Sequence, residues 1–410
     1  MPLPSSLPKV FTSKNSYVDT AGNVMEVALY RDLVRKRQRW DVQVIAPEAR
    51  SCRVIEDYRK QQRYEIDLDA NTCRRIRIQP RVSMKPIRLL RGASLKRTER
   101  IADSVTRLYH KEERVSSGSD HAGERYVIGP EYRTMARIAN LNVVRTGRSL
   151  NPVAIREQQR LRNGLLVQSF TLIRDFQAYT RPLDASVFAV PEDCPPGPGA
   201  HPAHGEIAPS SAGSPGDLGS AGDAPSPSRL VYPAFVTRRY AFNSTMEVTS
   251  QEQRHFDSLS NRERVDIRQR PHFNHTIRLI SRYDLQRLYE VDLGTGRCNS
   301  FPLTGTLIPP SVTETAVFLG YERVGNSRVE FYHEPNGPYG LEFTWRMFRR
   351  GDRLEYVSDL VNSSGIYTAA LWTDFTGSEE PLPESLFAPP SGCDGDAKAA
   401  GSGNCGDPAR

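Results

Sequence analysis

Two short stretches, Tyr64–Leu68 (YEIDL) and Tyr289–Leu293 (YEVDL), decide the fold of this chain of 410 residues. In both, apolar side chains alternate with charged ones, which is the pattern of a half-buried β-strand. A turn follows each stretch, at Asp69–Thr72 (DANT) and at Gly294–Gly296 (GTG), and the alternation resumes at Arg75–Ile78. The pattern predicts a β-hairpin in both places.

The second stretch repeats the first at an offset of 225 residues, and the same offset relates Cys73 to Cys298. It also relates six residues of the first half to six of the second: Asp32, Arg37, Arg39, Asp41, Ile55 and Tyr58 to Asp257, Arg262, Arg264, Asp266, Ile280 and Tyr283. A later block, Leu183–Cys194, returns as Leu382–Cys393 at an offset of 199, so the first half carries about 26 extra residues between the blocks. This self-similarity indicates a duplicated domain.

Two segments differ in composition from the rest. Residues 195–228 contain no Lys or Arg and are rich in Pro, Gly, Ser and Ala, and residues 394–410 have a similar character. Such segments bury too little apolar surface to offset the entropy of ordering. We therefore expect a first module at 1–194, a disordered linker at 195–228, a second module at 229–393 and a disordered tail at 394–410.

The expected fold class is mainly β (α+β), with two tandem antiparallel incomplete β-barrels and one helical segment. Further alternating runs, such as Trp40–Ile45 and Val236–Val248, support several strands per module. The helix is expected within Leu95–Lys111, where Ile101, Val105, Leu108 and Tyr109 have helical spacing. It would either pack on the outside of its sheet or cover the mouth of the half-open barrel.

Six cysteines occur, and four have equivalent places in the two copies. This placement predicts the disulfides Cys73–Cys194 and Cys298–Cys393. Cys52 and Cys405 are left over and could pair with each other, with another chain or not at all. Three N-x-S/T sequons, at Asn243, Asn274 and Asn362, all lie in the second module and are candidate glycosylation sites. The start, Met1–Val10, does not have the apolar core of a secretory signal, so either the protein stays inside the cell or this chain lacks its natural N-terminus. Cysteines and sequons together favour an extracellular or lumenal protein.

No catalytic motif stands out. The chain lacks GxSxG, Walker and HExxH patterns, and the GTG turn lacks the third glycine and the helix of a phosphate loop. His272 and His275 have HxxH spacing without an acidic partner, and no metal or cofactor is expected. The carboxylates repeated in both modules (Glu65, Asp67, Glu290 and Asp292) suit solvated or ion-paired strand faces better than acid–base catalysis. We expect a non-catalytic protein, with an unrecognised hydrolase as the minor alternative.

Charge is distributed unevenly. Residues 1–194 hold 35 Lys+Arg against 22 Asp+Glu, whereas the remainder holds 20 against 26. The basic half could attract heparin-like polymers, anionic lipid or nucleic acid. The candidate residues for such polyanions are Arg35, Lys36, Arg37, Arg39, Arg74, Arg75 and Arg77. Nucleic acid is the least favoured of these partners, because no aromatic residues are interleaved with the arginines. The alternative is that the arginines are spread over solvent-exposed faces of the strands and bind no polyanion.

The repeated blocks YEIDLDANTCRRIRI and YEVDLGTGRCNSFPL, with the closing blocks SVFAVPEDC and SLFAPPSGC, resemble the LolA-like modules of animal proteins, which are related to ependymin-type proteins. The segments Asp32–Asp41 and Ile128–Glu131, with Asp257–Asp266 and Leu319–Glu322, resemble further blocks of that family. Neither Thr134–Val144 nor Val324–Tyr332 has the cysteine that commonly follows the family's mid-domain glycine. The resemblance implies a secreted or membrane-attached, incomplete antiparallel barrel with helical cover and a concave apolar face.

The leading hypothesis is therefore a non-catalytic extracellular protein that binds a lipid, another hydrophobic small molecule or a protein partner. Further LolA-like domains are among the possible partners. Polyanion binding by the basic first module is the alternative hypothesis. No apolar run reaches the roughly 20 residues of a membrane-spanning helix.

Overall fold

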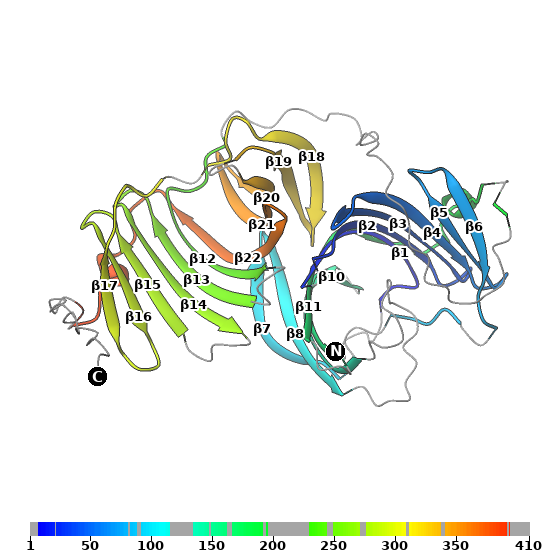
Figure 1. Ribbon diagram of the computed structural model, residues 1–410, viewed down its shortest axis with the longest axis horizontal. Coiled ribbons are helices and arrows are strands. Elements are labelled where there is room, and N and C mark those ends of the chain that lie inside the picture. Colours follow the sequence, from blue (N-terminus) through cyan, green and yellow to red (C-terminus); the bar gives the residue numbers. More distant parts are fainter. Residues whose placement is uncertain are drawn as a thin grey trace, which may run out of the picture.

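In the computed structural model, the described residues are 7–20, 22–80, 83–87, 92–114, 134–146, 149–161, 166–191, 194–195, 229–243, 249–270, 276–308, 311–337, 341–391 and 393. In this part of the chain the fold is mainly β, with short 3-10 helices. The strands form one large antiparallel sheet that does not close on itself (Figure 1). The expected linker, apart from Pro195, and the expected tail lie outside the described residues.

The first half forms an antiparallel ladder in the order β6-β5-β4-β3-β2-β1-β11-β10-β9-β8-β7. Its strands are β1 (Val10–Asp19), β2 (Val24–Asp32), β3 (Arg37–Ala46), β4 (Arg50–Asp57), β5 (Gln62–Asp67), β6 (Thr72–Arg77), β7 (Ser94–Ile101), β8 (Ser104–Arg114), β9 (Thr134–Thr146), β10 (Ser149–Leu161) and β11 (Leu166–Ala178). A 3-10 helix, η1 (Ala185–Phe188), follows the last strand.

The second half repeats this order as β17-β16-β15-β14-β13-β12-β22-β21-β20-β19-β18. Its strands are β12 (Ala234–Asn243), β13 (Thr249–Asp257), β14 (Arg262–Arg270), β15 (Thr276–Arg282), β16 (Arg287–Asp292), β17 (Cys298–Pro302), β18 (Val317–Val324), β19 (Ser327–Glu334), β20 (Glu342–Arg350), β21 (Arg353–Ser363) and β22 (Ile366–Ser378). The 3-10 helix η3 (Glu384–Phe387) corresponds to η1.

The two ladders also share their irregularities. In β7 the pairing register shifts between Leu95 and Arg97, and in β18 it shifts between Phe318 and Gly320. Both β11 and β22 contain a bulge, at which Asp175 and Asp374 adopt positive φ angles of 48° and 54°. These shared features give a residue-by-residue correspondence between the halves, with offsets of 225 for β2–β6 and 223 for β7 and β8.

The halves meet along a surface that we call the seam, where β7 lies against β22 and where β18 lies against β11 (Figure 1). Its contacts are reciprocal: Asp175 Oδ1 accepts the Arg323 N–H at 2.8 Å, and Asp374 Oδ1 accepts the Arg100 N–H at 2.7 Å. The hydroxyls of the corresponding residues Ser104 and Ser327 lie 2.8 Å apart. The seam therefore has an approximate two-fold symmetry.

One apolar core spans the seam. From the first half it contains Val18, Ile101, Val153, Phe170 and Leu172, and from the second half Phe242, Val324, Val357, Ala369 and Leu371, among others. All of these side chains are buried. Because removal of apolar surface from water is the main source of stability, the two halves are held together as one packed body.

The prediction of a helix within Leu95–Lys111 is wrong, because this segment forms the hairpin of β7 and β8. The hairpin turns at Ala102, which has a left-handed φ of 53°. Glycine usually occupies such a position, so the sequence does not mark this turn. Val105, which a helix would place on the buried face, is 63% exposed, whereas Ile101 and Leu108 are buried as strand residues.

Candidate functional site

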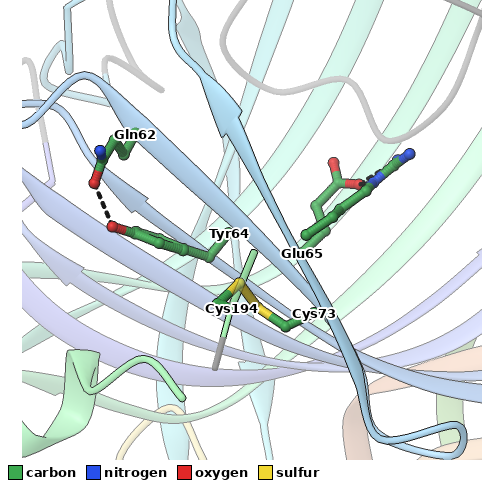
Figure 2. Close-up of a disulfide and its surroundings, with 6 residues drawn as sticks. Gln62, Tyr64, Glu65, Cys73 and Cys194 are labelled. Carbon is green, nitrogen blue, oxygen red and sulfur yellow. Dashed lines mark hydrogen bonds and ion pairs between the residues drawn. A yellow bond between two sulfur atoms is a disulfide. The ribbon is translucent and has the colours of Figure 1, made fainter. Parts of the chain in front are cut away.

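The structure pairs Cys73 with Cys194 and Cys298 with Cys393, which are the pairs expected from the repeat. Each disulfide ties the hairpin after the YE(I/V)DL stretch to the segment that ends its half, and Figure 2 shows the first of them. Tyr64 and its counterpart Tyr289 are buried in small apolar clusters beside these bonds. Cys52 is free and half-buried, and Cys405 lies outside the described residues.

The repeated basic and acidic residues upstream of the hairpin form a clamp on η1 and η3. Asp41 accepts hydrogen bonds from Arg39 and Arg53, and Arg39 Nη1 donates to the Val187 carbonyl of η1 at 2.7 Å. In the second half Asp266 accepts from Arg264 and Arg278, and Arg264 Nη1 donates to the Leu386 carbonyl of η3 at 3.1 Å. Because the same contacts stabilise the same segment in both copies, this motif has a structural role.

The pKa values of the two clamp carboxylates reflect this arrangement. Burial opposes the ionisation of Asp266, but the hydrogen bonds from Arg264 and Arg278 outweigh it and lower its pKa from 3.8 to about 2. Arg39 and Arg53 lower the pKa of Asp41 in the same way. Both carboxylates are therefore charged at neutral pH and are poor candidates for proton transfer.

The repeated carboxylates of the hairpins also have structural partners. Asp67 Oδ1 accepts the N–H groups of Asp69 and Ala70, and Asp292 Oδ1 accepts those of Gly294 and Thr295. Glu65 pairs with Arg74, whose side chain is largely exposed. These bonds stabilise the turns, which is a common role of Asp in such positions.

The seven polyanion candidates do not form one free cationic surface. Arg37 pairs with Asp57, Arg39 with Asp41 and Arg74 with Glu65, while Arg35 donates to the Leu183 carbonyl. Lys36 occupies an exposed turn, and Arg75 and Arg77 lie on the edge strand β6. Much of their charge is therefore already compensated within the first half.

Of the remaining residues singled out in the sequence, the structure describes some and not others. Asn362 donates to Glu342 Oε2 at 2.8 Å and Asn243 donates to Thr368 Oγ1 at 3.2 Å, so both sequon residues lie on strands of the second ladder. Asn274, His272, His275 and Ile128–Glu131 lie outside the described residues. Within the described part, no group of three His, Cys, Asp or Glu side chains is arranged to hold a metal ion. No helix of this part is long and apolar enough to cross a membrane.

A pocket of about 580 Å³, which the sequence did not predict, opens beside the seam. Arg97 of β7 lines it from the first half, and Arg238 of β12 and Arg268 of β14 line it from the second. Gln251 and Gln253 of β13 lie between these two strands and present amide groups. The pocket thus combines three guanidinium groups with neutral hydrogen-bonding side chains.

The charges around this pocket leave an excess of positive charge. Arg97 pairs with Glu99 at 2.7 Å, and Arg238 pairs with Asp374 at 2.9 Å. Arg268 is exposed and has no ion pair among the described residues. Two carboxylates also line the pocket, but Asp266 is held by Arg264 and Arg278, and Glu252 is held by Arg239 and Arg254.

Tyr240, which lines the pocket, is buried and has several polar neighbours. The Tyr240 hydroxyl donates to the buried carboxylate of Glu99, and the Arg156 guanidinium stacks on the Tyr240 ring, 3.9 Å from its centroid. Glu99 also accepts from Asn142 Nδ2 at 2.8 Å. Burial lowers the pKa of Arg156 to about 10, so this residue is still charged at neutral pH.

At the corresponding place in the first half, a buried ion-pair network fills the space. Arg346 Nε donates to Glu322 Oε2 at 2.7 Å, and Arg174 bridges Glu322 and Glu26. Arg346 also reaches Ser16 Oγ, which corresponds to Tyr240. The counterpart of Arg346 is Asn142, which is buried and bonds to Glu99 and Arg156 on the other side of the seam.

Comparisons with known proteins do not identify the chain. No family matches it, and no curated protein matches it. An uncharacterised conserved protein of Thermus thermophilus aligns with 46% of this chain and 90% of its own length, at 11% identity and a TM-score of 0.28. Kievitone hydratase from Nectria haematococca aligns with 92% of this chain and 91% of its own length, at 7% identity and a TM-score of 0.17. Scores this low carry no argument about fold or function, and they give the resemblance to LolA-like modules no support.

Proposed function

We propose that this chain is a non-catalytic extracellular protein that binds anionic ligands. The observation that carries the proposal is the pocket beside the seam, which three arginine side chains from the strands β7, β12 and β14 line. Guanidinium groups favour carboxylate, sulfate and phosphate partners because of their fixed fork of donors. The two disulfides fit an oxidising environment.

The lipid hypothesis has less support. The second half holds an aromatic and aliphatic cluster in which Phe235, Tyr332, Met347 and Phe375 are buried against one another. Within it Tyr356 and Trp372 stack with centroids 4.8 Å apart. Such side chains occupy space that an apolar ligand would need. The half-barrel form and the LolA-like kinship remain hypotheses that rest on the repeated blocks.

The proposal predicts that the purified protein binds heparin and releases it as salt concentration rises. Because binding of a polyanion releases its counterions, the apparent affinity should fall about tenfold or more between 50 and 200 mM NaCl. Affinity chromatography and calorimetry on the intact chain measure this dependence. Neutral dextran serves as the control matrix, and equal retention on both matrices, or none on heparin, would contradict the proposal.

A further inference from the structure

The duplicated fold offers an internal comparison that separates structural residues from functional ones. The clamp residues around Asp266 recur around Asp41, so the fold requires them in both copies. Arg238 of the pocket corresponds to Lys14, and both pair with the aspartate at the bulge of the next strand. Two exposed pocket residues do not recur, because Arg268 and Gln251 correspond to Gln43 and Glu26. The same ladder therefore forms with other side chains at these two exposed positions, so the fold does not require Arg268 or Gln251.

We propose that the pocket beside the seam binds an acidic oligosaccharide. This inference rests on the proposed function, which it narrows to one ligand class and one place. The arginines supply charge-assisted hydrogen bonds for carboxylate or sulfate groups. The neutral donors and acceptors for sugar hydroxyls lie in one cross-strand row, in which Thr276 neighbours Arg268 and Arg268 neighbours Gln251.

The size and shape of the pocket agree with this class of ligand. Its volume of about 580 Å³ lies in the usual range of small-molecule sites and suits a short oligosaccharide. Exposed side chains at its rim, Arg268 and Gln251, leave it open to solvent, so a longer chain could continue beyond it. Tyr240, which lines the pocket, is 3% exposed and is held by Glu99 and by the Arg156 guanidinium that stacks on its ring.

The test uses substitutions that the other half of the molecule already carries. Gln251→Glu together with Arg268→Gln gives the pocket the residues found at Glu26 and Gln43, and both positions are exposed. The matched control is Arg75→Gln with Arg77→Gln on the edge strand β6, which makes the same change in net charge. Circular dichroism and thermal unfolding establish that both variants fold.

Binding of a heparin tetrasaccharide is measured by calorimetry for the intact wild-type chain and for both variants. We expect the pocket variant to lose affinity at least tenfold and the β6 variant to lose less than threefold. Three further probes separate the ligand chemistries: a hyaluronan tetrasaccharide, a chitin tetrasaccharide and inorganic tripolyphosphate. Binding of the hyaluronan tetrasaccharide without binding of the chitin tetrasaccharide supports the inference. Tighter binding of tripolyphosphate than of the acidic oligosaccharides overturns it. Equal binding by wild type and pocket variant overturns the inference but leaves anion binding intact, whereas no anion binding by the wild type removes both proposals.

Discussion

Glu322→Ala is expected to lower the free energy of unfolding by about 3–5 kcal/mol, because it leaves two buried arginines without their shared partner. Arg174 and Arg346 have side chains only 3% exposed, and both bind the Glu322 carboxylate. Glu26, whose side chain is 30% exposed, is then the carboxylate that still pairs with both arginines. Urea denaturation followed by tryptophan fluorescence measures the loss.

The control for this variant is Glu379→Ala, which removes an exposed ion pair with Arg353. Exposed pairs are worth about 0–1 kcal/mol, so this change should be small. The pH dependence adds a second check: burial opposes ionisation of Glu322, but Arg346 and Arg174 lower its pKa below 4.5. The stabilisation by the network is therefore complete above pH 4.5 and declines as the pH falls through the lowered pKa. If both variants lose the same stability, the seam network does not hold the halves together.

Removing the second disulfide by Cys298→Ser with Cys393→Ser is expected to cost about 2–5 kcal/mol. The bond joins residues 95 apart in the sequence, so the unfolded chain gains much freedom when it is removed. Its loss also frees the segment that carries Phe387, which is completely buried. Thermal unfolding should show a lower midpoint.

Cys52→Ser is the matched control, because Cys52 is a half-buried thiol without a disulfide. Its substitution should change stability by less than about 1 kcal/mol. The reduced wild-type protein should lose at least as much stability as the double serine variant, since reduction also opens Cys73–Cys194. A double variant as stable as wild type would show that the disulfide is not needed to hold the closing segment.

The sequence predicted the parts of the fold that repeat at fixed spacing. The alternation in Tyr64–Asp67 and its copy is local, so the hairpins could be inferred from neighbouring residues alone. The disulfide pairs could be inferred from the equivalent places of four cysteines in the two copies. The error at Leu95–Lys111 has a physical cause: apolar residues at positions 101, 105 and 108 fit a helix face, and the turn at Ala102 carries no glycine or asparagine.

The pocket could not be predicted from local patterns, because Arg97, Arg238 and Arg268 come together only when the two halves dock. One signal was available in the sequence: aligning the copies at the offset of 225 places Arg268 opposite Gln43 and Gln251 opposite Glu26. Differences between copies of a duplicated fold mark positions that the fold does not fix. The seam itself involves reciprocal contacts such as Asp175 with Arg323, for which no sequence pattern exists.

The account depends most on the docking of the two halves, because the pocket joins Arg97 of the first half to residues of β12–β14 in the second. The most direct measurement introduces a protease site within residues 196–228, cuts the folded protein there and follows the fragments by size-exclusion chromatography. The apolar core and the ion pairs across the seam predict that both fragments elute together at the volume of the uncut protein. Elution as two separate folded fragments would contradict the seam and, with it, the pocket.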